Sequence, residues 1–550
     1  MTKYGKLLRK IVSVILILSV LLSFGACKKD DENDENGEND DNNNNTDVLT
    51  PMVDPIDDNY RTFYQIFVGS FSDGNNDGFG DLRGIINRFD YLNDGDINSG
   101  KSLGVQGIWL SPIFSSPSYH KYDVKDYYQV DWRFGNEETL KELIDLCHER
   151  NVKIILDLVL NHTSSQHPWF LAFKEARLAG DTENKYYDFY TAVTTEEKVG
   201  GRTYQKIAGI DCWFECNFSG DMPELNFDNP EVKEEMLKVA KYYLDLGVDG
   251  FRFDAVKYIY YGDTPSSVDF WEWYMDELTK IKPDIYCVGE CWSGESEILS
   301  YYGAMNCFNF AMSQSEGFAA NAAKGKSLST FTNYIVSYQK KVRENNPEGM
   351  EMSFLSNHDM DRIAGAFVME TYNRMAANLY LLSPGSPFIY YGEEIGIRGS
   401  RGSANTDANR RLAMLWGDGD LVRDPVGSTY PKDKQIQTTV ADQIADENSL
   451  YNYYCKLIAV RHKHPAIARG TYTALSTSDK NLGGFLVEYE GEKLGIIHNN
   501  SASEKTYDLS KCTGLSGYTF EMIADAIGSG QATLEGTTLT VGAYTSVILK

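Results

Sequence analysis

The sequence has no excess of basic residues and no regular cysteine framework. Its 52 Lys and Arg stand against 79 Asp and Glu, a net charge of −27. This balance argues against nucleic-acid binding, which needs a basic face. The nine cysteines form neither an even, closely spaced set nor paired CxxC motifs, so neither a disulfide scaffold nor a zinc site is indicated. Cys212 and Cys216 could form a bridge, but two small buried residues are the simpler interpretation.

The first 58 residues contain little that could form a folded core. Residues 1–26 have a basic start and an apolar run at 11–22, as in a secretory signal. Gly25 and Ala26 precede Cys27, an arrangement that resembles a bacterial lipobox and predicts a lipid anchor on Cys27. Residues 27–58 are acidic and asparagine-rich, so we expect a disordered tether. These features predict an exported lipoprotein, held to the membrane at the cell surface; the alternatives are a plain signal peptide or an uncleaved anchor helix.

From residue 59 onward, buried strands alternate with amphipathic helices. Helices are predicted at 136–151, 230–246, 267–281 and 449–464. Strands are predicted at 63–71, 104–114, 152–162, 248–256, 285–290, 308–311, 351–359 and 386–396. Strands this apolar are typical of a parallel sheet that is covered on both faces. The alternation predicts a (β/α)8 barrel built from residues 59–162 and 228–464.

Two segments interrupt or follow this alternation. Residues 163–227 are irregular, aromatic and polar, and they are too long for an ordinary connection between a strand and a helix. We expect them to form an inserted domain after the third strand. Residues 465–550 are short alternating runs separated by turns, which predict a C-terminal antiparallel β-sandwich.

Charged side chains lie at the ends of several predicted strands. Arg252 and Asp254 are two residues apart, so on a strand they point to the same side. In one isolated strand a structural ion pair would be an equally good interpretation. Acidic or histidine residues also end three other strands, at 154–162, 286–290 and 353–359. Such residues, gathered at the ends of parallel strands, are typical of the active site of a (β/α)8 barrel.

An oxygen-rich loop follows the first predicted strand. Its side-chain oxygens fall at alternate positions of a glycine-rich turn, which suits a hard cation. The expected ligands of a structural Ca2+ are Asp73, Asn75, Asp77 and Asp81, with the carbonyl group of Phe79. A turn without metal uses the same residue types, and Gly84 stands where an EF-hand would have Glu. The spacing favours a metal.

Four motifs in order carry a family resemblance: DLVLNH (157–162), GFRFDAVKY (250–258), GE (289–290) and LSNHD (355–359). Together they resemble glycoside hydrolase family 13, the α-amylase family, over about residues 59–550. A fifth stretch, MPELN (222–226), is similar to a motif of members intermediate between oligo-1,6-glucosidases and neopullulanases, with Glu224 in place of the more usual Asp.

The resemblance implies a retaining mechanism on α-linked glucose. Asp254 would be the nucleophile, Glu290 the general acid/base and Asp359 a stabiliser of the transition state. Retention implies a separation of ~5–5.5 Å between the carboxyl groups of Asp254 and Glu290. Arg252 is expected to lower the pKa of Asp254. The residues that would hold the reacting glucose are His120, Tyr122 (by stacking), Asp157, His162, Arg252, His358, Asp407 and Arg411. Lys257 would contact the sugar on the leaving side.

Two departures from the family pattern leave points open. Tyr258 follows Lys257 where α-amylases often have His, and Asn161 matches a calcium ligand whose acidic partners are not evident in 163–227. The favoured interpretation is endo-hydrolysis of α-1,4 bonds by a monomeric enzyme. Alternatives are a neopullulanase-like or oligo-1,6-specific hydrolase, a transglycosylase, or a non-catalytic glycan-binding protein. The last usually lacks one of the three carboxylates, and here all three are present.

Overall fold

The computed structural model describes residues 58–96, 99–367 and 369–550. The predicted signal segment, the lipid anchor at Cys27 and nearly all of the tether therefore lie outside the described residues. Within the described ranges, no helix combines the length and the apolar character that crossing a bilayer requires.

The central element is a parallel sheet whose strands are almost completely buried. Its order is β11-β10-β9-β5-β2-β1-β12. In chain order the strands are β1 (Phe63–Ile66), β2 (Gly107–Leu110), β5 (Lys153–Leu158), β9 (Gly250–Phe253), β10 (Tyr286–Gly289), β11 (Asn306–Cys307) and β12 (Phe388–Tyr390). Their apolar side chains are covered on both faces, as expected for parallel strands with helices between them.

Residues 351–359, all described, form two isolated bridges where a seventh strand was predicted. Met352 pairs with Phe308 beyond β11, and Phe354 pairs with Phe388 of β12, both in parallel. These bridges bring the two edge strands to a common neighbour and close the sheet into a barrel. The sixth strand is also displaced, to residues 306–307. Several strands are shorter than predicted because the chain leaves the sheet early to form loops; β1, for example, leads into the 3-10 helix Val68–Ser70.

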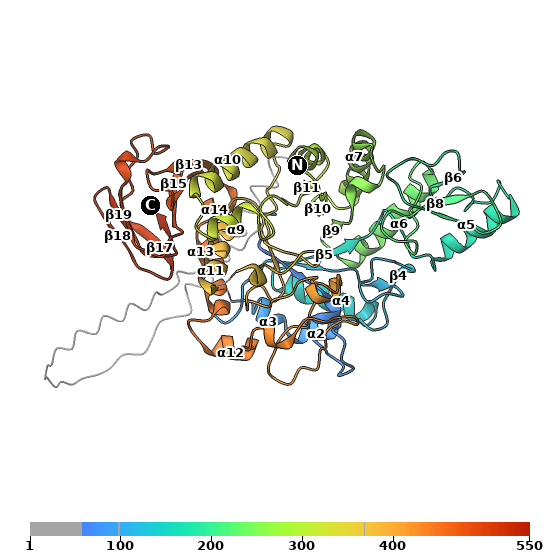
Figure 1. Cartoon of the computed structure of the whole chain (residues 1–550), viewed down its shortest axis with the longest axis horizontal. Helices are drawn as coiled ribbons and strands as arrows, with labels where there is room; N and C mark the ends of the chain where they lie inside the picture. The colour runs from blue at the N-terminus through green and yellow to red at the C-terminus, as the bar shows by residue number, and fades with distance from the viewer. Residues whose placement is uncertain (1–57, 97–98, 368) are drawn as a thin grey trace, which may run out of the picture. The chain divides into compact units, whose positions relative to one another are not determined.

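Helices follow the strands (Figure 1), and their ends obey simple capping rules. Asn136 caps α4 (Glu137–Glu149) by accepting a hydrogen bond from the Thr139 amide. Asn229 caps α6 (Pro230–Leu246) in the same way. Helix α7 (Thr264–Ile281) begins before the predicted residue 267 because Asp263 caps it. Apart from α5 (Pro168–Ala179) of the insertion, the other α-helices of the described residues are α2 (Leu82–Asn87), α3 (Phe89–Leu92), α8 (Glu295–Ser300), α9 (Phe318–Ala323), α10 (Leu328–Asn345), α11 (Glu370–Leu381), α12 (Val440–Ala445), α13 (Leu450–Lys463) and α14 (Ala466–Arg469).

The segment after β5 contains its own small fold. Helix α5 (Pro168–Ala179) is followed by a three-stranded antiparallel sheet in the order β6-β8-β7, formed by Ala192–Val193, Trp213–Glu215 and Tyr204–Lys206. Bridges join His162 to Glu224 and Tyr190 to Leu225. The end of the segment is therefore paired with the chain that leaves β5, at the carboxyl end of the barrel strands.

The C-terminal strands, red in Figure 1, form two antiparallel sheets with a second apolar core. One sheet has the order β13-β14-β15-β20-β17 and the other β16-β19-β18. Their bounds are β13 (Thr471–Ser476), β14 (Leu482–Tyr489), β15 (Glu492–Asn499), β16 (Lys505–Asp508), β17 (Ile523–Gly528), β18 (Ala532–Glu535), β19 (Thr538–Val541) and β20 (Thr545–Leu549). Asn378 of α11 donates hydrogen bonds to the Ile527 carbonyl and to Ser546, which joins this domain to the barrel helices.

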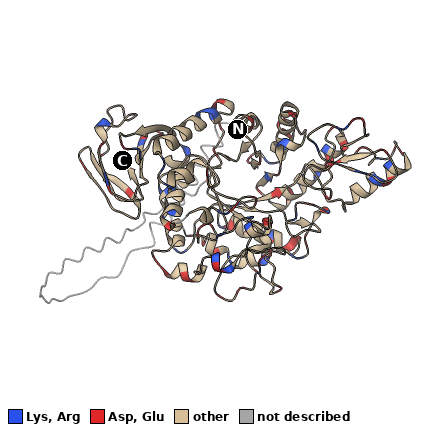
Figure 2. Ribbon diagram, viewed as in Figure 1, with Lys and Arg blue, Asp and Glu red and all other residues tan. Residues whose placement is uncertain are grey.

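The fold is thus a (β/α)8 barrel with an insertion after its third strand and a C-terminal antiparallel β domain. The eight described cysteines are all free and buried, including Cys212 and Cys216. Figure 2 shows basic and acidic residues interspersed along the described ribbon.

Candidate active site

A fully buried arginine on β9 is the centre of the site. Arg252 donates one hydrogen bond of 2.8 Å to Asp157 and another of 2.8 Å to Asp254. Its second amino group lies 2.9 Å from a carboxylate oxygen of Glu290. One guanidinium therefore holds carboxylates from three neighbouring strands. Gly250 allows the backbones of β9 and β10 to approach this closely, because a Cβ there would lie 1.8 Å from the Tyr286 carbonyl oxygen of β10.

Asp157 is buried beneath the site and is saturated with hydrogen bonds. Besides Arg252, it accepts a bond of 2.8 Å from the Tyr122 hydroxyl and one of 3.2 Å from the Trp109 indole. The guanidinium also lies over the Trp109 and Tyr122 rings, at 5.1 and 5.8 Å. Asp157 therefore positions Arg252 and Tyr122 and does not face the cavity.

The backbone after Asp254 turns sharply toward Glu290. Ala255 has a φ of 49°, in the left-handed region that non-glycine residues rarely adopt. Its amide lies 3.3 Å from a Glu290 carboxylate oxygen and donates to it. Backbone conformations of this kind are concentrated at functional sites, where the surrounding fold maintains them.

Asp359 is held by a different set of partners. Arg411 donates a hydrogen bond of 2.7 Å to one of its oxygens, and His358 Nε2 lies 2.9 Å from the other. His358 Nδ1 lies 2.8 Å from the Gln65 amide nitrogen. With Gln65 donating, His358 carries its proton on Nε2 and can donate it to Asp359.

Burial and neighbouring charges divide the carboxylates into two kinds. Burial raises the pKa of Glu290 to about 7; Arg252 opposes this, while Asp254 and Asp359 add to it. Burial would also raise the pKa of Asp359, but His358 and Arg411 outweigh it and the pKa of Asp359 is lowered. The site therefore contains an acid that keeps its proton near neutral pH and a carboxylate that stays ionised.

The prediction that Arg252 lowers the pKa of Asp254 is confirmed for the effect of Arg252 itself, but the net pKa shift of Asp254 is in the opposite direction. Arg252 does favour the ionised form, but burial is the larger effect and Asp359 adds to it, so the pKa of Asp254 is raised. The sequence shows the neighbouring arginine, whereas the degree of desolvation depends on the packing of the whole barrel.

A cavity of about 840 Å³ opens above these carboxylates. Asp157, Arg252 and His358 lie beneath its wall. The predicted residues that line it are Asp254, Glu290, Asp359, His120, Tyr122, His162, Lys257, Asp407 and Arg411. Burial lowers the pKa of both His120 and His162 to about 4, so both imidazoles are neutral above that pH.

Two predicted residues make contacts that their spacing did not indicate. Asp407 binds Arg401 and Arg410, while Arg411 binds Asp359. Lys257 donates a hydrogen bond of 2.8 Å to the Trp292 carbonyl at the rim of the cavity.

Several aromatic residues of the cavity were not found from the sequence. Phe218 and Trp292 line it and are 44% and 43% exposed. Tyr258 lies between Phe218, at 4.6 Å, and Tyr261, on which it stacks at 4.5 Å. Trp292 could have been predicted to line the cavity, since it stands two residues after Glu290. Phe218 lies in the irregular insertion, where no periodicity indicates which side chains face the site.

In the loop after β1, several of the predicted metal ligands accept hydrogen bonds from backbone amides of the same loop. Asp73 accepts hydrogen bonds from four backbone amides, at residues 75–78. One oxygen of Asp81 accepts from Gly74 and Gly84, while the other, Oδ2, is buried without a partner. Among the described residues, no group of three or more His, Cys, Asp or Glu forms a metal centre by itself. The loop fits a hard cation through its mixed carboxylate, amide and carbonyl oxygens and the free Asp81 oxygen.

The environment of Asn161 favours a structural role. Its carbonyl accepts from the Leu225 amide. Glu224, which is buried nearby, accepts from the backbone and side chain of Asn217, and Glu215 is paired with Arg202 at 3.0 Å. The acidic groups near Asn161 are therefore already bound to protein donors.

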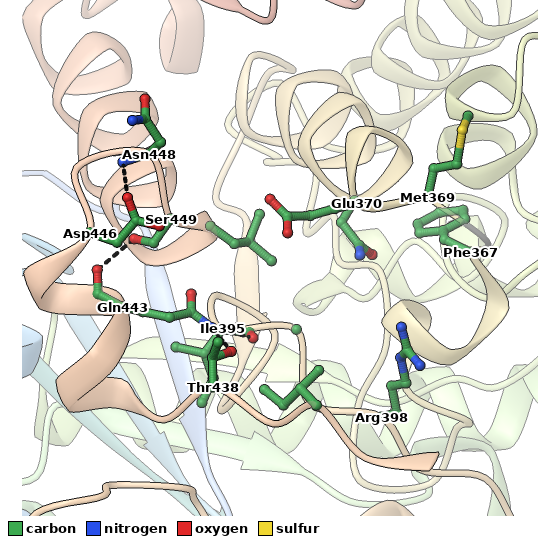
Figure 3. A pocket seen from close by; sticks show the side chains of 14 residues that line it. Phe367, Met369, Glu370, Ile395, Arg398, Thr438, Gln443, Asp446, Asn448 and Ser449 are labelled. Atoms are coloured by element: carbon green, nitrogen blue, oxygen red, sulfur yellow. Dashed lines mark hydrogen bonds between the residues drawn. The ribbon is translucent and has the colours of Figure 1, made fainter. Parts of the chain in front are cut away.

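A second, smaller cavity of about 170 Å³ lies beside α11, α12 and the start of α13 (Figure 3). Gln443 lines this cavity and donates hydrogen bonds to the Ile395 carbonyl and to the Thr438 hydroxyl. None of the residues that line it belongs to the predicted active site.

Comparison with known proteins agrees with this geometry. The model of the α-amylase catalytic domain matches residues 65–470. Alpha-amylase 3 of Dictyoglomus thermophilum is 38% identical over 82% of this chain and 86% of its own length. The 4-alpha-glucanotransferase of Thermotoga neapolitana is 30% identical over 81% and 97%. The solved structure of Eubacterium rectale Amy13B superposes with a TM-score of 0.83 at 34% identity, covering 91% of this chain and 97% of that one.

The site and these relatives define a glycoside hydrolase barrel. The chain belongs to the α-amylase family, glycoside hydrolase family 13.

Proposed function

We propose that this protein is an α-amylase that cleaves internal α-1,4-glucosidic bonds of starch and maltodextrins with retention of configuration. The observation that carries the proposal is the set of three carboxylates, Asp254, Glu290 and Asp359, which face one large aromatic-lined cavity. A cavity of about 840 Å³ has room for more than one sugar ring, as cleavage within a chain requires.

In the proposed mechanism, protonated Glu290 donates its proton to the glycosidic oxygen while a carboxylate oxygen of Asp254 attacks the anomeric carbon. The leaving sugar departs, and a covalent glycosyl ester forms on Asp254. Ionised Glu290 then takes a proton from a water molecule, whose oxygen attacks the anomeric carbon and breaks its bond to the Asp254 carboxylate. Asp359, kept ionised by His358 and Arg411, would accept hydrogen bonds from sugar hydroxyls as positive charge develops on the ring.

A transglycosylase or an enzyme that also cleaves α-1,6 bonds would use the same carboxylates. The similarity to a 4-alpha-glucanotransferase gives this alternative weight. The choice between hydrolysis and transfer depends on whether water or a sugar hydroxyl reaches the glycosyl ester. We expect the aromatic wall that Phe218, Tyr258 and Trp292 form to influence this choice.

The first test is a product time course with a soluble fragment starting at about residue 48. Amylose and pullulan are incubated in parallel, and the products are separated by size. Rapid loss of iodine colour with a ladder of short oligosaccharides is the expected result for amylose. Panose from pullulan would indicate a neopullulanase, and longer chains built from maltotriose would indicate a transferase. Binding without products from either polymer would contradict the proposal.

The pH profile tests the role of Glu290. With the pKa of Glu290 at about 7, the protonated acid disappears as pH rises through this value. We therefore expect kcat/KM for maltooligosaccharides to fall tenfold per pH unit above about pH 7. The profile is measured from pH 5 to 9 at constant ionic strength. The limb should disappear when the wild type is assayed on a nitrophenyl glycoside, whose leaving group needs no proton, and Glu290→Gln, which has no titrating acid at this position, should show no such limb. A limb that persists in Glu290→Gln would assign it to another group.

We also propose that the loop of residues 73–81 binds a structural Ca2+. Binding to the folded state alone would contribute about 2.7 kcal/mol when free Ca2+ is one hundred times Kd. A chelator should therefore lower the Tm by several degrees, as measured by calorimetry. In Asp77→Asn the turn can still form, because the amide oxygen can accept the hydrogen bond from the Phe79 amide. Because Asn keeps an oxygen but loses the negative charge, we expect this variant to bind Ca2+ more weakly and to show a smaller chelator shift at limiting Ca2+; an unchanged shift in Asp77→Asn would contradict the assignment.

Export and lipid anchoring at Cys27 remain part of the proposal, as does the monomeric state. The support for export and anchoring is the sequence before residue 58 and the proposed substrate, since a starch polymer is too large to enter a cell. Metabolic labelling with a fatty acid, compared with Cys27→Ala, tests the anchor.

A further inference from the structure

Two exposed aromatic rings lie outside the catalytic cavity. Trp132 is 72% exposed and Phe79 is 42% exposed. The Arg133 guanidinium lies over both of them, 4.8 Å from the Trp132 ring and 5.5 Å from the Phe79 ring. A tryptophan left this open to water is unusual, because most of its surface is apolar.

The base beneath these rings is rigid. Asp131, next to Trp132, is buried, pairs with Lys121 at 2.7 Å and donates its amide to the Ile113 carbonyl. The Phe134 carbonyl accepts from the Leu82 amide, which joins this segment to the start of α2. Rings held on such a base lose little conformational entropy when they bind a ligand.

The position of the rings connects them with the catalytic cavity. Phe79 lies in the loop after β1, and Trp132 in the connection between β2 and α4. Both are at the carboxyl end of the barrel strands, the end that carries the active site. Lys121, the partner of Asp131, stands between His120 and Tyr122, two residues that line the cavity. One buried ion pair thus joins the exposed rings to the active-site loop.

We propose that Trp132, Arg133 and Phe79 form a second glycan-binding surface that holds a glucan chain outside the catalytic cavity; this inference rests on the proposed function. The apolar faces of glucose rings stack on indole and phenyl groups, and a guanidinium donates hydrogen bonds to sugar hydroxyls. A glucan carries no charge, so the net charge of −27 does not repel it as it would a polyanion. Such a surface would retain a polymer near the active site and leave short oligosaccharides unaffected.

The test separates polymer binding from chemistry. In the Asp254→Asn background, where substrate is not consumed, retention on insoluble starch is measured with Trp132 intact and with Trp132→Ala. We expect Trp132→Ala to weaken retention about tenfold, the loss expected for one buried aromatic contact. In the active background, the same variant should cleave maltotetraose at the wild-type rate but digest starch granules several times more slowly. Trp132→Phe, which keeps a ring, should recover most of the retention.

Leu178→Ala is the matched control, because Leu178 is 50% exposed on α5 and belongs to neither site. It should leave both measurements unchanged. Equal starch retention in Trp132→Ala and in the parent protein would overturn the inference, as would an equal loss on maltotetraose and on granules. Failure of the proposed function looks different: the wild-type protein would then cleave neither substrate.

Discussion

Replacing Asp254 by Asn is expected to lower kcat on maltooligosaccharides by on the order of 10⁴-fold, the scale on which loss of a nucleophile acts. The amide has the size of the carboxylate and can still accept the 2.8 Å hydrogen bond from Arg252. Arg252 also keeps its contacts to Asp157 and Glu290. The fold should therefore be unchanged, and the loss should be one of chemistry. Single-turnover measurements on a nitrophenyl maltooligosaccharide are the appropriate assay.

Two matched variants make this result specific. Glu290→Gln should retain fast release of nitrophenol in the first turnover, since that leaving group needs no proton, and should be slow only afterwards. Asp254→Asn should be slow from the start. Asp407→Asn, in the same cavity but bound by Arg401 and Arg410, should raise KM more than it lowers kcat. Undiminished turnover in Asp254→Asn would reject Asp254 as the nucleophile.

Replacing Arg252 by Met is expected to have the largest effect on stability. Removing one partner of a buried ion pair costs about 3–5 kcal/mol, because the opposite charge stays buried without compensation. Here Asp157, Asp254 and Glu290 all lose the same guanidinium. We expect a decrease of about this size in the free energy of unfolding, measured by urea denaturation at pH 7, together with loss of activity.

The pH dependence of this loss has a definite sign. Without Arg252 the folded-state pKa values of the three carboxylates would rise further above their unfolded values. The folded protein would then bind more protons than the unfolded one, so its stability would fall as pH rises from about 4 toward 7 and above. Arg401→Met is the control: Arg401 pairs with Asp407 at the surface, with 44% of its side chain exposed, and should cost less than about 1 kcal/mol. Equal stability of Arg252→Met and wild type would contradict the central role of this residue.

The features that follow from local rules could be predicted from the sequence. The alternation of apolar strands with capped helices was enough to predict the barrel, and Asn136 and Asn229 cap helices as expected. The spacing of Arg252 and Asp254 placed both on one side of a strand, where they form an ion pair. These features depend on residues close together in the chain, and a strand or helix period relates them directly.

The tertiary structure alone decided the features that depend on distant residues. The predicted seventh strand became two bridges because its partners, near β11 and in β12, set its length. Arg411 binds Asp359 and not Asp407, since the approach of two loops decides that choice. Phe218 reaches the cavity from an insertion without periodicity. The pKa of Asp254 is raised because burial in the assembled barrel outweighs one neighbouring charge, and no pattern in the sequence measures desolvation.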